Sequence, residues 1–332
     1  MSKVARFHQT GGPEVIQLDD MDLSAPKADE VLIKVNTIGL NRAEVMFRSG
    51  QYLETPELPA RLGYEASGVI EQLGSNVSQF NIGDKVNAIP AFSMNQYGTY
   101  AEQAVLPVHA IVKQPANLSD VEAAAIWMQY LTAWGALIDI GHLSAGQTLL
   151  IPAASSSVGL AAIQIANLVG AIPVAITRTA AKKASLEQHG AKHVIVSETD
   201  KIAKQVQLIT DGKGADMVFD PVAGPALTEL ADACGRFAQL FIYGVLDTEM
   251  TPFPLLAALS KGLTVRGYTL FEITQDAKRL QHGIEFIEQG IAAGQLKPVI
   301  AKTFTLDDIV AAHQYMESNQ QIGKIVVTTK NA

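Results

Sequence analysis

The sequence contains a single cysteine, Cys234, among its 332 residues. One cysteine excludes an internal disulfide and any zinc site built from several cysteines. Its surroundings, ADACGRFAQLF, are mostly apolar, so we expect a buried packing role rather than a reactive thiol. No apolar run reaches the ~20 residues of a membrane-spanning helix, and the first residues lack the features of a secretory signal. We therefore expect a soluble cytoplasmic protein without a membrane partner.

Positive charge is scarce as well. The chain has 25 Lys and Arg against 33 Asp and Glu, which gives a formal net charge of −8. This balance argues against nucleic-acid binding through a broad basic face. The histidines form no metal-binding pattern, because His189 and His193 are separated by Gly190, which ends the predicted helix. No G-x-S-x-G motif of a serine hydrolase occurs.

The remaining composition fits a packed enzyme, with 48% hydrophobic and 17% charged residues. A chain of this length exceeds the usual size of one core, so two domains are expected. Between residues 148 and 270, short apolar runs alternate with helical patterns, which predicts a parallel sheet covered by helices on both faces. The expected strands span residues 148–153, 172–177, 193–196, 216–220, 237–243 and 263–270.

The first 120 or so residues have a different pattern. Short strand-like runs at 31–40, 66–74, 84–90 and 101–107 are separated by Gly, Pro, Asn and Asp, which indicates a β-rich region. After residue 270 come helical patterns near 275–292 and 307–318 and a closing strand, KIVVTT. We predict a discontinuous β-rich domain of residues 1–123 and 270–332, with the parallel-sheet domain, residues 124–269, inserted in it.

The stretch AASSSVG, residues 153–159, stands where a strand turns into a helix. Because the first N–H groups of a helix lack internal partners and carry the positive end of its dipole, this turn is a potential anion site. Of the glycines in the dinucleotide fingerprint G-x-G-x-x-G, only Gly159 is present, and a capped helix without a ligand is the alternative. We predict dinucleotide binding by Ser155, Ser156, Ser157 and Val158.

The end of the next strand indicates which dinucleotide is bound. NAD sites have an acidic residue there that holds the ribose, whereas NADP sites replace it and add cations for the 2′-phosphate. This sequence has Thr177, Arg178 and Lys182 and no acid before Glu187. Cations at this place would bind the phosphate that a carboxylate would repel, so NADPH is the predicted cofactor.

At this point the chain resembles the medium-chain dehydrogenase/reductase superfamily, in its zinc-free quinone oxidoreductase branch. The resemblance covers nearly the full length and implies an α/β fold, with a Rossmann-type doubly wound parallel-sheet domain inserted in a GroES-like catalytic domain. Its segments are GLNRAEVMFRSGQY, LGYEASGVI, NIGDKV, GTYAEQAVLP, LTAWGAL, AASSSVGLAAIQIA, DPVAG and IGKIVV.

Zinc-dependent members of the superfamily have cysteine and histidine ligands where this chain has Asn41, Tyr64 and Met128. These residues do not supply the nitrogen and sulfur ligands that zinc prefers, so we expect no bound metal. Without zinc, hydride delivery to a simple ketone leaves an alkoxide, which is about as strong a base as the hydroxide formed from bulk water. A quinone leaves a phenolate-like anion near pKa 10, a difference of about 7 to 8 kcal/mol, so a quinone or another conjugated carbonyl is the expected acceptor.

The resemblance also implies site residues. Asn41, Tyr52 and Tyr64 would donate hydrogen bonds to the acceptor oxygen, and Met128 would form an apolar wall; a turn residue, packing aromatics and core packing are the respective alternatives. The cofactor residues implied in addition to the serine turn are Thr132, Tyr243, Gly244, Phe271 and Lys324. For Lys324, the alternative is an exposed charge on an edge strand.

The expected function is NADPH-dependent hydride transfer to a quinone or a similar conjugated carbonyl. An enone or enoyl-thioester reductase with the same cofactor is one alternative, and a nucleotide-binding protein without turnover is another. The resemblance implies a homodimer in which the strand near LTVRGYTL pairs across two subunits. The acidic charge makes nucleic acid an unexpected partner.

Overall fold

The computed structural model describes residues 1–329 and divides the chain into two compact units. One, here the β-rich unit, comprises Met1–Met128 and Pro298–Ala332; the other, the parallel-sheet unit, comprises Gln129–Lys297. The second is therefore inserted in the chain of the first, as the sequence predicted. The boundaries follow residues 128 and 297, however, and not 123 and 269. A side chain at Gly283 would collide with Leu131 and Trp134, so the long helix after residue 276 packs tightly within the parallel-sheet unit.

The β-rich unit is organised around a mostly antiparallel sheet in the order β15-β16-β3-β5-β6-β8, with β7 also paired to β3. The longest strand, β3, is buried along nearly its whole length because its residues are mainly β-branched and apolar. The strands of this sheet are β3 (Glu30–Gly39), β5 (Glu65–Leu73), β6 (Lys85–Ala88), β7 (Gln103–Pro107), β8 (Ile111–Lys113), β15 (Ile300–Thr305) and β16 (Lys324–Thr328).

A second, three-stranded sheet of the same unit has the order β2-β1-β4. Its strands are β1 (Ser2–Phe7), β2 (Ile16–Met21) and β4 (Ala60–Arg61), and the sequence patterns did not predict them. The helices of the unit are short: α1 (Arg42–Arg48), α2 (Asp120–Ala123) and α11 (Ile309–Glu317). Helix α1 begins directly after β3, where Asn41 and Glu44 form a capping box.

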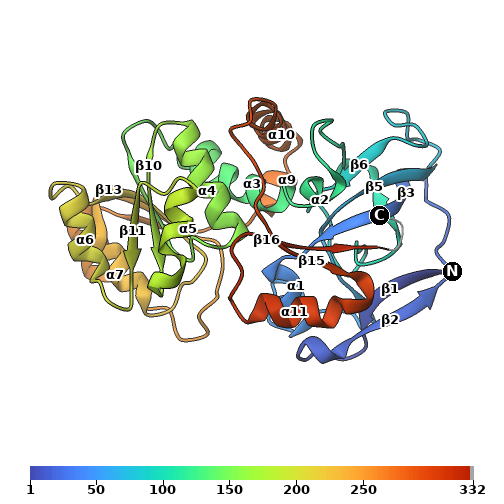
Figure 1. Cartoon of the computed structure of the whole chain (residues 1–332), viewed down its shortest axis with the longest axis horizontal. Coiled ribbons are helices and arrows are strands. Elements are labelled where there is room, and N and C mark those ends of the chain that lie inside the picture. Colours follow the sequence, from blue (N-terminus) through green and yellow to red (C-terminus); the bar gives the residue numbers. More distant parts are fainter. Residues whose placement is uncertain (330–332) are drawn as a thin grey trace. The chain divides into compact units, whose positions relative to one another are not determined.

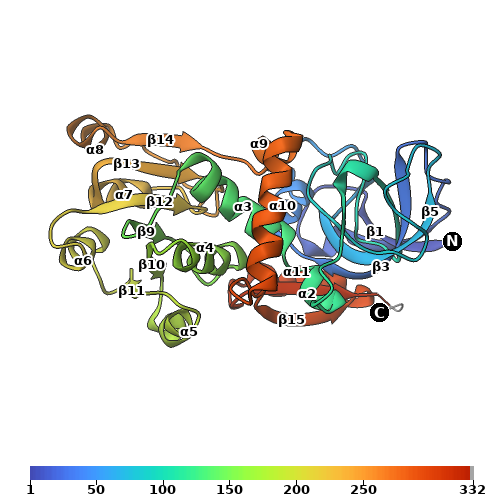
Figure 2. The same cartoon turned by 90° about the horizontal axis from the view of Figure 1, so that it is seen from above.

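The parallel-sheet unit has six strands in the order β11-β10-β9-β12-β13-β14, which Figure 2 shows side by side. All five strand pairs are parallel. The order doubles back at β9, so the sheet is doubly wound. The strands are β9 (Thr148–Ile151), β10 (Ile172–Thr177), β11 (His193–Val196), β12 (Ala215–Asp220), β13 (Cys234–Ile242) and β14 (Thr264–Gly267).

Helices cover both faces of this sheet. Helices α4 and α5 lie on one side and α6 and α7 on the other (Figure 1), as right-handed crossovers require. The helices of the unit are α3 (Trp127–Trp134, which continues as a π-helical segment Gly135–Ile140), α4 (Ser157–Leu168), α5 (Lys183–Gln188), α6 (Ile202–Ile209), α7 (Ala226–Ala233), α8 (Leu255–Lys261), α9 (Phe271–Thr274) and α10 (Ala277–Ala292).

Side chains from β9, β10, β12 and β13 and from α6 and α7 form a buried apolar core in this unit. Cys234 belongs to that core with 1% of its surface exposed, which confirms the predicted packing position. Burial raises the pKa of its thiol to about 12, so the thiolate is not formed near neutral pH. Among the described residues, no helix is long and apolar enough to cross a membrane.

Candidate functional site

The serine turn in the parallel-sheet unit joins β9 to α4, as predicted. Ser156 is the N-cap of α4, and its hydroxyl oxygen accepts a hydrogen bond from the Gly159 N–H at 3.0 Å. This bond satisfies one of the N–H groups that the first helical turn leaves without internal acceptors. The N–H groups of Ser157 and Val158, at the first two helical positions, lie at the positive end of the helix dipole. The turn has the geometry to bind an anion.

Close packing explains the one glycine of this turn. A Cβ on Gly159 would lie 2.6 Å from the Ala154 carbonyl oxygen and 2.7 Å from its Cα. Ala153 adopts a φ of 48°, in the left-handed region that non-glycine residues rarely occupy. The chain therefore bends sharply between β9 and α4, and only glycine fits at position 159. This is the packing role that the dinucleotide fingerprint assigns to its last glycine.

One cation contacts this turn, and a second lies near the first. The Lys182 ammonium donates a hydrogen bond to the Ser155 hydroxyl at 3.1 Å, and so connects the start of α5 to the turn. Burial and the like charge of the nearby Arg178 guanidinium lower the pKa of Lys182. Because the two cations repel each other, a dianionic phosphate placed between them would stabilise both. Thr177, at the end of β10, is 7% exposed.

The carboxyl ends of β12 and β13 provide further polar groups of this unit. The Tyr243 ring stacks on Phe219 with ring centroids 4.0 Å apart, and its buried hydroxyl has no hydrogen-bond partner in the part of the chain that the structure describes. A Cβ on Gly244 would lie 2.7 Å from the Pro221 carbonyl oxygen, so the chain needs glycine there. Ligands of doubly wound sheets bind at this edge, and an unpaired buried hydroxyl is a group that a ligand can satisfy.

Asp220, which the sequence analysis did not single out, lies at the same edge. Its carboxylate accepts hydrogen bonds from the N–H groups of Val222 at 2.8 Å and Ala223 at 3.0 Å. Burial nevertheless raises the pKa of Asp220 to about 6. The other predicted cofactor residues of the unit are Thr132, on α3 and 6% exposed, and Phe271, the first residue of α9.

In the β-rich unit, Tyr52 and Tyr64 lie together within a row of aromatic side chains. Their ring centroids are 6.4 Å apart, and Tyr64 is fully buried whereas Tyr52 is partly exposed. Burial raises the pKa of Tyr52 to about 12 and that of Tyr64 further. The two hydroxyl groups interact with each other, and each affects the pKa of the other. Tyr52 is the more exposed of the two residues.

Asn41 differs from its predicted role as a donor to the acceptor oxygen. Its amide nitrogen already donates to the Glu44 carboxylate at 3.1 Å and to the Gly39 carbonyl at 3.2 Å. Its backbone N–H donates to the other Glu44 oxygen at 2.5 Å. Since both amide protons have acceptors within the chain and the residue is 8% exposed, Asn41 organises its surroundings.

Lys324 is buried, with 1% of its surface exposed. It lies on β16, between β15 and β3, so the alternative of an exposed charge on an edge strand is wrong. Its ammonium forms an ion pair with Glu65 and donates to the Asn41 side-chain oxygen at 2.6 Å. Glu65 in turn accepts the backbone N–H of Met128 at 2.8 Å. Whether Lys324 also contacts the cofactor stays a prediction.

Glu44 and Glu65 are site residues that the sequence analysis missed. Each had a signal. Glu44 stands three residues after Asn41, the spacing of a capping box, and Glu65 is an acid at the start of the predicted strand β5. A buried acid in a strand is rare unless it is paired. Its partners, however, come from β16 and from the start of α3, which local sequence does not reveal.

The three positions that carry zinc ligands in other members of the superfamily hold Asn41, Tyr64 and Met128 in this chain. The Asn41 oxygen accepts from Lys324, and the Tyr64 hydroxyl interacts with that of Tyr52. Among residues 1–329, no group of three or more His, Cys, Asp and Glu side chains is arranged to hold a metal ion. An amide, a phenol and a thioether do not fit the donors that zinc prefers.

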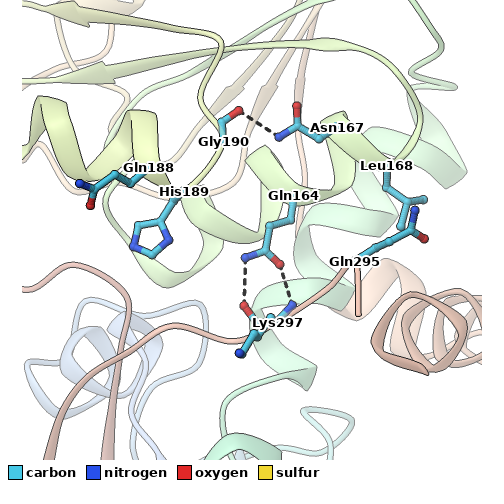
Figure 3. Close-up of a pocket in the computed structure, with 8 residues that line it drawn as sticks. All are labelled: Gln164, Asn167, Leu168, Gln188, His189, Gly190, Gln295 and Lys297. Atoms are coloured by element: carbon cyan, nitrogen blue, oxygen red, sulfur yellow. Dashed lines mark hydrogen bonds between the residues drawn. The ribbon is translucent and has the colours of Figure 1, made fainter. Parts of the chain in front are cut away.

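A pocket of about 420 Å³ opens elsewhere in the parallel-sheet unit, between the C-terminal half of α4, the end of α5 and residues 295–297 (Figure 3). Gln164 makes two hydrogen bonds of 2.9 Å with the Lys297 backbone, and Asn167 donates to the Gly190 carbonyl at 2.9 Å. Gln164 is about 10 Å along α4 from Ser157, and no predicted site residue lines this pocket. Its polar side chains connect elements of the unit.

Comparison with known protein families gives matches over both units. The family described as "Alcohol dehydrogenase GroES-like domain" matches residues 27–116, and the family described as "Zinc-binding dehydrogenase" matches residues 189–327. The first range lies in the β-rich unit. The second includes most of the parallel strands and the closing β16.

Full-length relatives extend these matches. The chain is 34% identical over 336 residues to a quinone oxidoreductase from Pongo abelii, covering 98% of each chain. It is 27% identical to a 2-haloacrylate reductase from Burkholderia, covering 98% of this chain and 99% of the relative. The solved structure of Escherichia coli quinone oxidoreductase complexed with NADPH superposes with a TM-score of 0.91 at 27% identity, covering 98% and 99% of the two chains.

Proposed function

Because the chain belongs to the quinone oxidoreductase-like family of medium-chain dehydrogenases/reductases, we propose that it is an NADPH-dependent oxidoreductase that transfers hydride to a quinone or a similar conjugated carbonyl without zinc. The observation that carries this proposal is the serine turn with Lys182 bonded to Ser155 and Arg178 nearby. It combines an anion-binding helix terminus with the cations that a 2′-phosphate needs.

In the parallel-sheet unit, the proposed cofactor residues have distinct tasks. The N–H groups of Ser157 and Val158 would bind the pyrophosphate, while Arg178 and Lys182 would bind the 2′-phosphate. The buried Tyr243 hydroxyl and the closely packed Gly244 would meet the cofactor at the carboxyl ends of the strands. The remaining proposed contacts of this unit are Thr132, Ser155, Ser156, Thr177 and Phe271. A contact from Lys324, on β16 of the β-rich unit, is the one that the family resemblance implies. When bound, NADPH supplies the hydride.

In the β-rich unit, Tyr52 would donate its O–H to the acceptor oxygen, and the neighbouring Tyr64 ring would hold Tyr52 in place. Phenols with raised pKa values keep their protons near neutral pH, so this pair stabilises negative charge by hydrogen bonding. Met128 would contribute an apolar wall. We assign no obligatory proton transfer to Tyr52, because water can protonate a quinol anion.

The proposed absence of zinc rests on the donors present. The "Zinc-binding dehydrogenase" description of one matching family does not fit Asn41, Tyr64 and Met128, whose polar groups are hydrogen-bonded to neighbouring residues of the chain or are poor zinc donors. A hydrogen bond from Tyr52 suits a phenolate-like product, which is about 5 to 6 pKa units less basic than an alkoxide. This difference favours a conjugated acceptor.

Reduction of an activated carbon–carbon double bond is the second candidate function. The similarity to a 2-haloacrylate reductase supports it, because hydride addition to the β-carbon of an enone also leaves a delocalised anion. Both functions use the same cofactor and the same tyrosine pair. The two functions differ in the acceptor that binds beside Tyr52.

Steady-state kinetics of the purified chain test this proposal. We expect rapid NADPH oxidation with 1,2-naphthoquinone, slower oxidation with an alkyl enone, and no stoichiometric zinc by elemental analysis. Faster turnover of the enone would favour double-bond reduction. Tight NADPH binding with no acceptor reduced would favour a nucleotide-binding protein without turnover, and negligible NADPH binding would contradict both enzymatic functions.

We further propose that the protein is a cytoplasmic homodimer. The sheet of the parallel-sheet unit ends at β14, an edge strand with unpaired backbone groups that invites pairing with a second copy. Large apolar side chains are exposed on the neighbouring α8 and the loop before it: Met250, Phe253, Leu255, Leu256 and Leu259. Exposed apolar patches of this kind indicate an interface. Light scattering should give twice the mass of 35.4 kDa, and Leu256→Lys should shift the protein toward monomer.

A further inference from the structure

A buried cluster of charges in the β-rich unit has no step of the proposed hydride transfer assigned to it. Glu44 and Glu65 are fully buried, Lys324 is 1% exposed and Asn41 is 8% exposed. Two carboxylates and one ammonium give the cluster a net charge of −1 when all are ionised. Such groups are rarely buried unless they bind something, because removing charges from water is costly.

Each carboxylate holds one backbone N–H of a residue proposed to form the acceptor pocket. Glu44 accepts the Tyr64 N–H at 3.2 Å, and Glu65 accepts the Met128 N–H at 2.8 Å. Tyr64 supports the donor Tyr52, and Met128 provides the apolar wall. The positions of both residues therefore depend on where the two carboxylates lie.

Lys324 connects the two carboxylates. Its ammonium pairs directly with Glu65 and donates to the Asn41 oxygen at 2.6 Å. Asn41 then donates to Glu44 at 3.1 Å through its side chain and at 2.5 Å through its backbone. The chain of contacts Glu65–Lys324–Asn41–Glu44 joins β5, β16 and the start of α1.

Glycine at position 39 permits this arrangement. A Cβ there would collide with the Ala124 carbonyl oxygen and lie 2.6 Å from the Glu65 carboxylate. The backbone of β3 thus leaves room for the buried carboxylate. Space made for a charged group inside a core indicates that the group is part of the architecture of the site.

We propose that Lys324 is a positioning residue, whose buried ammonium serves as the internal cation that organises Asn41, Glu44 and Glu65 and thereby fixes Tyr64 and Met128 for the acceptor. This inference rests on the proposed function. It gives Lys324 a role in acceptor binding in place of the cofactor contact that the family resemblance implied.

Removal of the ammonium, alone and with charge compensation, tests the proposal. Lys324→Met removes the cation and makes the net charge of the cluster more negative by one. The double variant Lys324→Met/Glu65→Gln restores the wild-type net charge, and the glutamine oxygen can still accept the Met128 N–H. Arg48→Met is the matched control, because Arg48 is also a cation with 1% exposure in this unit but pairs with Glu317 and His313.

We expect Lys324→Met to lower kcat/KM for the quinone about 30-fold or more, while the Kd for NADPH changes less than about threefold. Hydrogen exchange should accelerate in the peptides that contain the Tyr64 and Met128 N–H groups. The double variant should recover most of both properties. Arg48→Met should lower thermal stability without a comparable loss of kcat/KM or of protection at these two amides.

Three results would overturn the proposal. One is a tenfold or greater weakening of NADPH binding with an unchanged KM for the quinone, which would make Lys324 a cofactor residue. Another is a Lys324→Met protein of lower stability with wild-type kinetics and exchange. The third is a double variant whose kcat/KM and hydrogen exchange are no closer to the wild type than those of Lys324→Met. Failure of both the single and the double variant to fold would count in the same way.

Failure of the proposed function is distinguishable from failure of this inference. Wild-type protein that does not oxidise NADPH with any conjugated acceptor contradicts the proposed function. Hydrogen exchange at Tyr64 and Met128 and its recovery in the double variant do not depend on turnover, so they report on the positioning role in either case.

Discussion

The Lys182 ammonium lies 3.1 Å from the Ser155 hydroxyl, which joins the predicted 2′-phosphate site to the predicted pyrophosphate site. The two residues are 27 positions apart in the sequence, on different strand–helix connections. This contact explains how one dinucleotide could engage both connections. It also means that the cations and the turn can be tested separately.

Cofactor preference depends on Arg178 and Lys182. Arg178→Ala and Lys182→Ala should each weaken NADPH binding by about 10- to 100-fold, because each removes a charge-assisted bond of about 1.5 to 3 kcal/mol. NADH binding should change little. Isothermal titration with both dinucleotides measures this difference. Lys192→Ala, an exposed lysine just before β11, should affect neither dinucleotide, and an equal loss for NADPH and NADH would place the phosphate site elsewhere.

The cap of α4 depends on the Ser156 hydroxyl. Ser156→Ala should lower the free energy of unfolding by about 1 kcal/mol, because the Gly159 N–H loses its acceptor. Ser156→Gly should cost only a few tenths of a kcal/mol, since glycine is itself a tolerated cap. Denaturant titration of both variants measures the difference. Ser157→Ala is the control, and a loss as large as that of Ser156→Ala would contradict the assigned cap.

Gly39 should be essential for stability. Gly39→Ala introduces a Cβ that collides with the Ala124 carbonyl and approaches the Glu65 carboxylate to 2.6 Å, so we expect a loss of about 3 kcal/mol or more. Gly267→Ala on β14 is the matched substitution, because no atom lies within 4 Å of its added Cβ. Thermal denaturation should separate the two, and similar melting temperatures would contradict the close packing of β3.

The buried His313 should make the protein sensitive to acid. Arg48 only donates hydrogen bonds, so the His313 Nδ1 accepts from it at 3.0 Å and the Nε2–H donates to the Tyr100 hydroxyl. Burial, with the Arg48 charge, lowers the pKa of His313 from 6.5 to about 3. The unfolded chain therefore takes up this proton near pH 6.5 but the fold does not, and up to about 5 kcal/mol of stability is lost as pH falls through this window.

Denaturation at a series of pH values measures this effect. His313→Gln should be less stable than the wild type at neutral pH but show a flatter decline between about pH 6.5 and 3. His282→Gln, which changes an exposed histidine on α10, should keep the wild-type slope. A wild-type slope in His313→Gln would contradict the assigned protonation. Asp220 acts in the opposite sense, because its raised pKa favours the fold as pH decreases.

The Tyr52 hydroxyl should raise kcat more when the product anion is strongly basic, as an enolate is, than when it is a quinol anion. Tyr52→Phe removes the O–H that is available to an acceptor oxygen, so kcat should decrease about 100-fold with an enone, whose enolate needs a donor. With a quinone, whose anion is less basic, a decrease of about tenfold or less is expected. Stopped-flow single-turnover measurements with both acceptors test this. Equal losses, or none, would remove Tyr52 from the site.

The sequence determined the secondary structure of the parallel-sheet unit and the character of its turn. Strong apolar periodicity, short loops and Gly159 after a run of serines predicted β9, α4 and the tight turn between them, because these features arise from neighbouring residues. Elements with weak sequence patterns were missed. Helix α1 and strands β1, β2 and β15 were not predicted, since they are short or depend on distant partners for their pairing.

Only the tertiary structure decided what the charged residues of the site do. Asn41, Glu44, Glu65 and Lys324 are spread over more than 280 positions, and strand pairing between β16 and β3 brings them together. Local sequence gives the chemical type of each side chain but not its partner, and in a buried site the partner determines whether an amide proton or an ammonium is available. The sequence by itself determined the scaffold and the cofactor chemistry, whereas burial and long-range contacts decided which polar groups remain for a substrate.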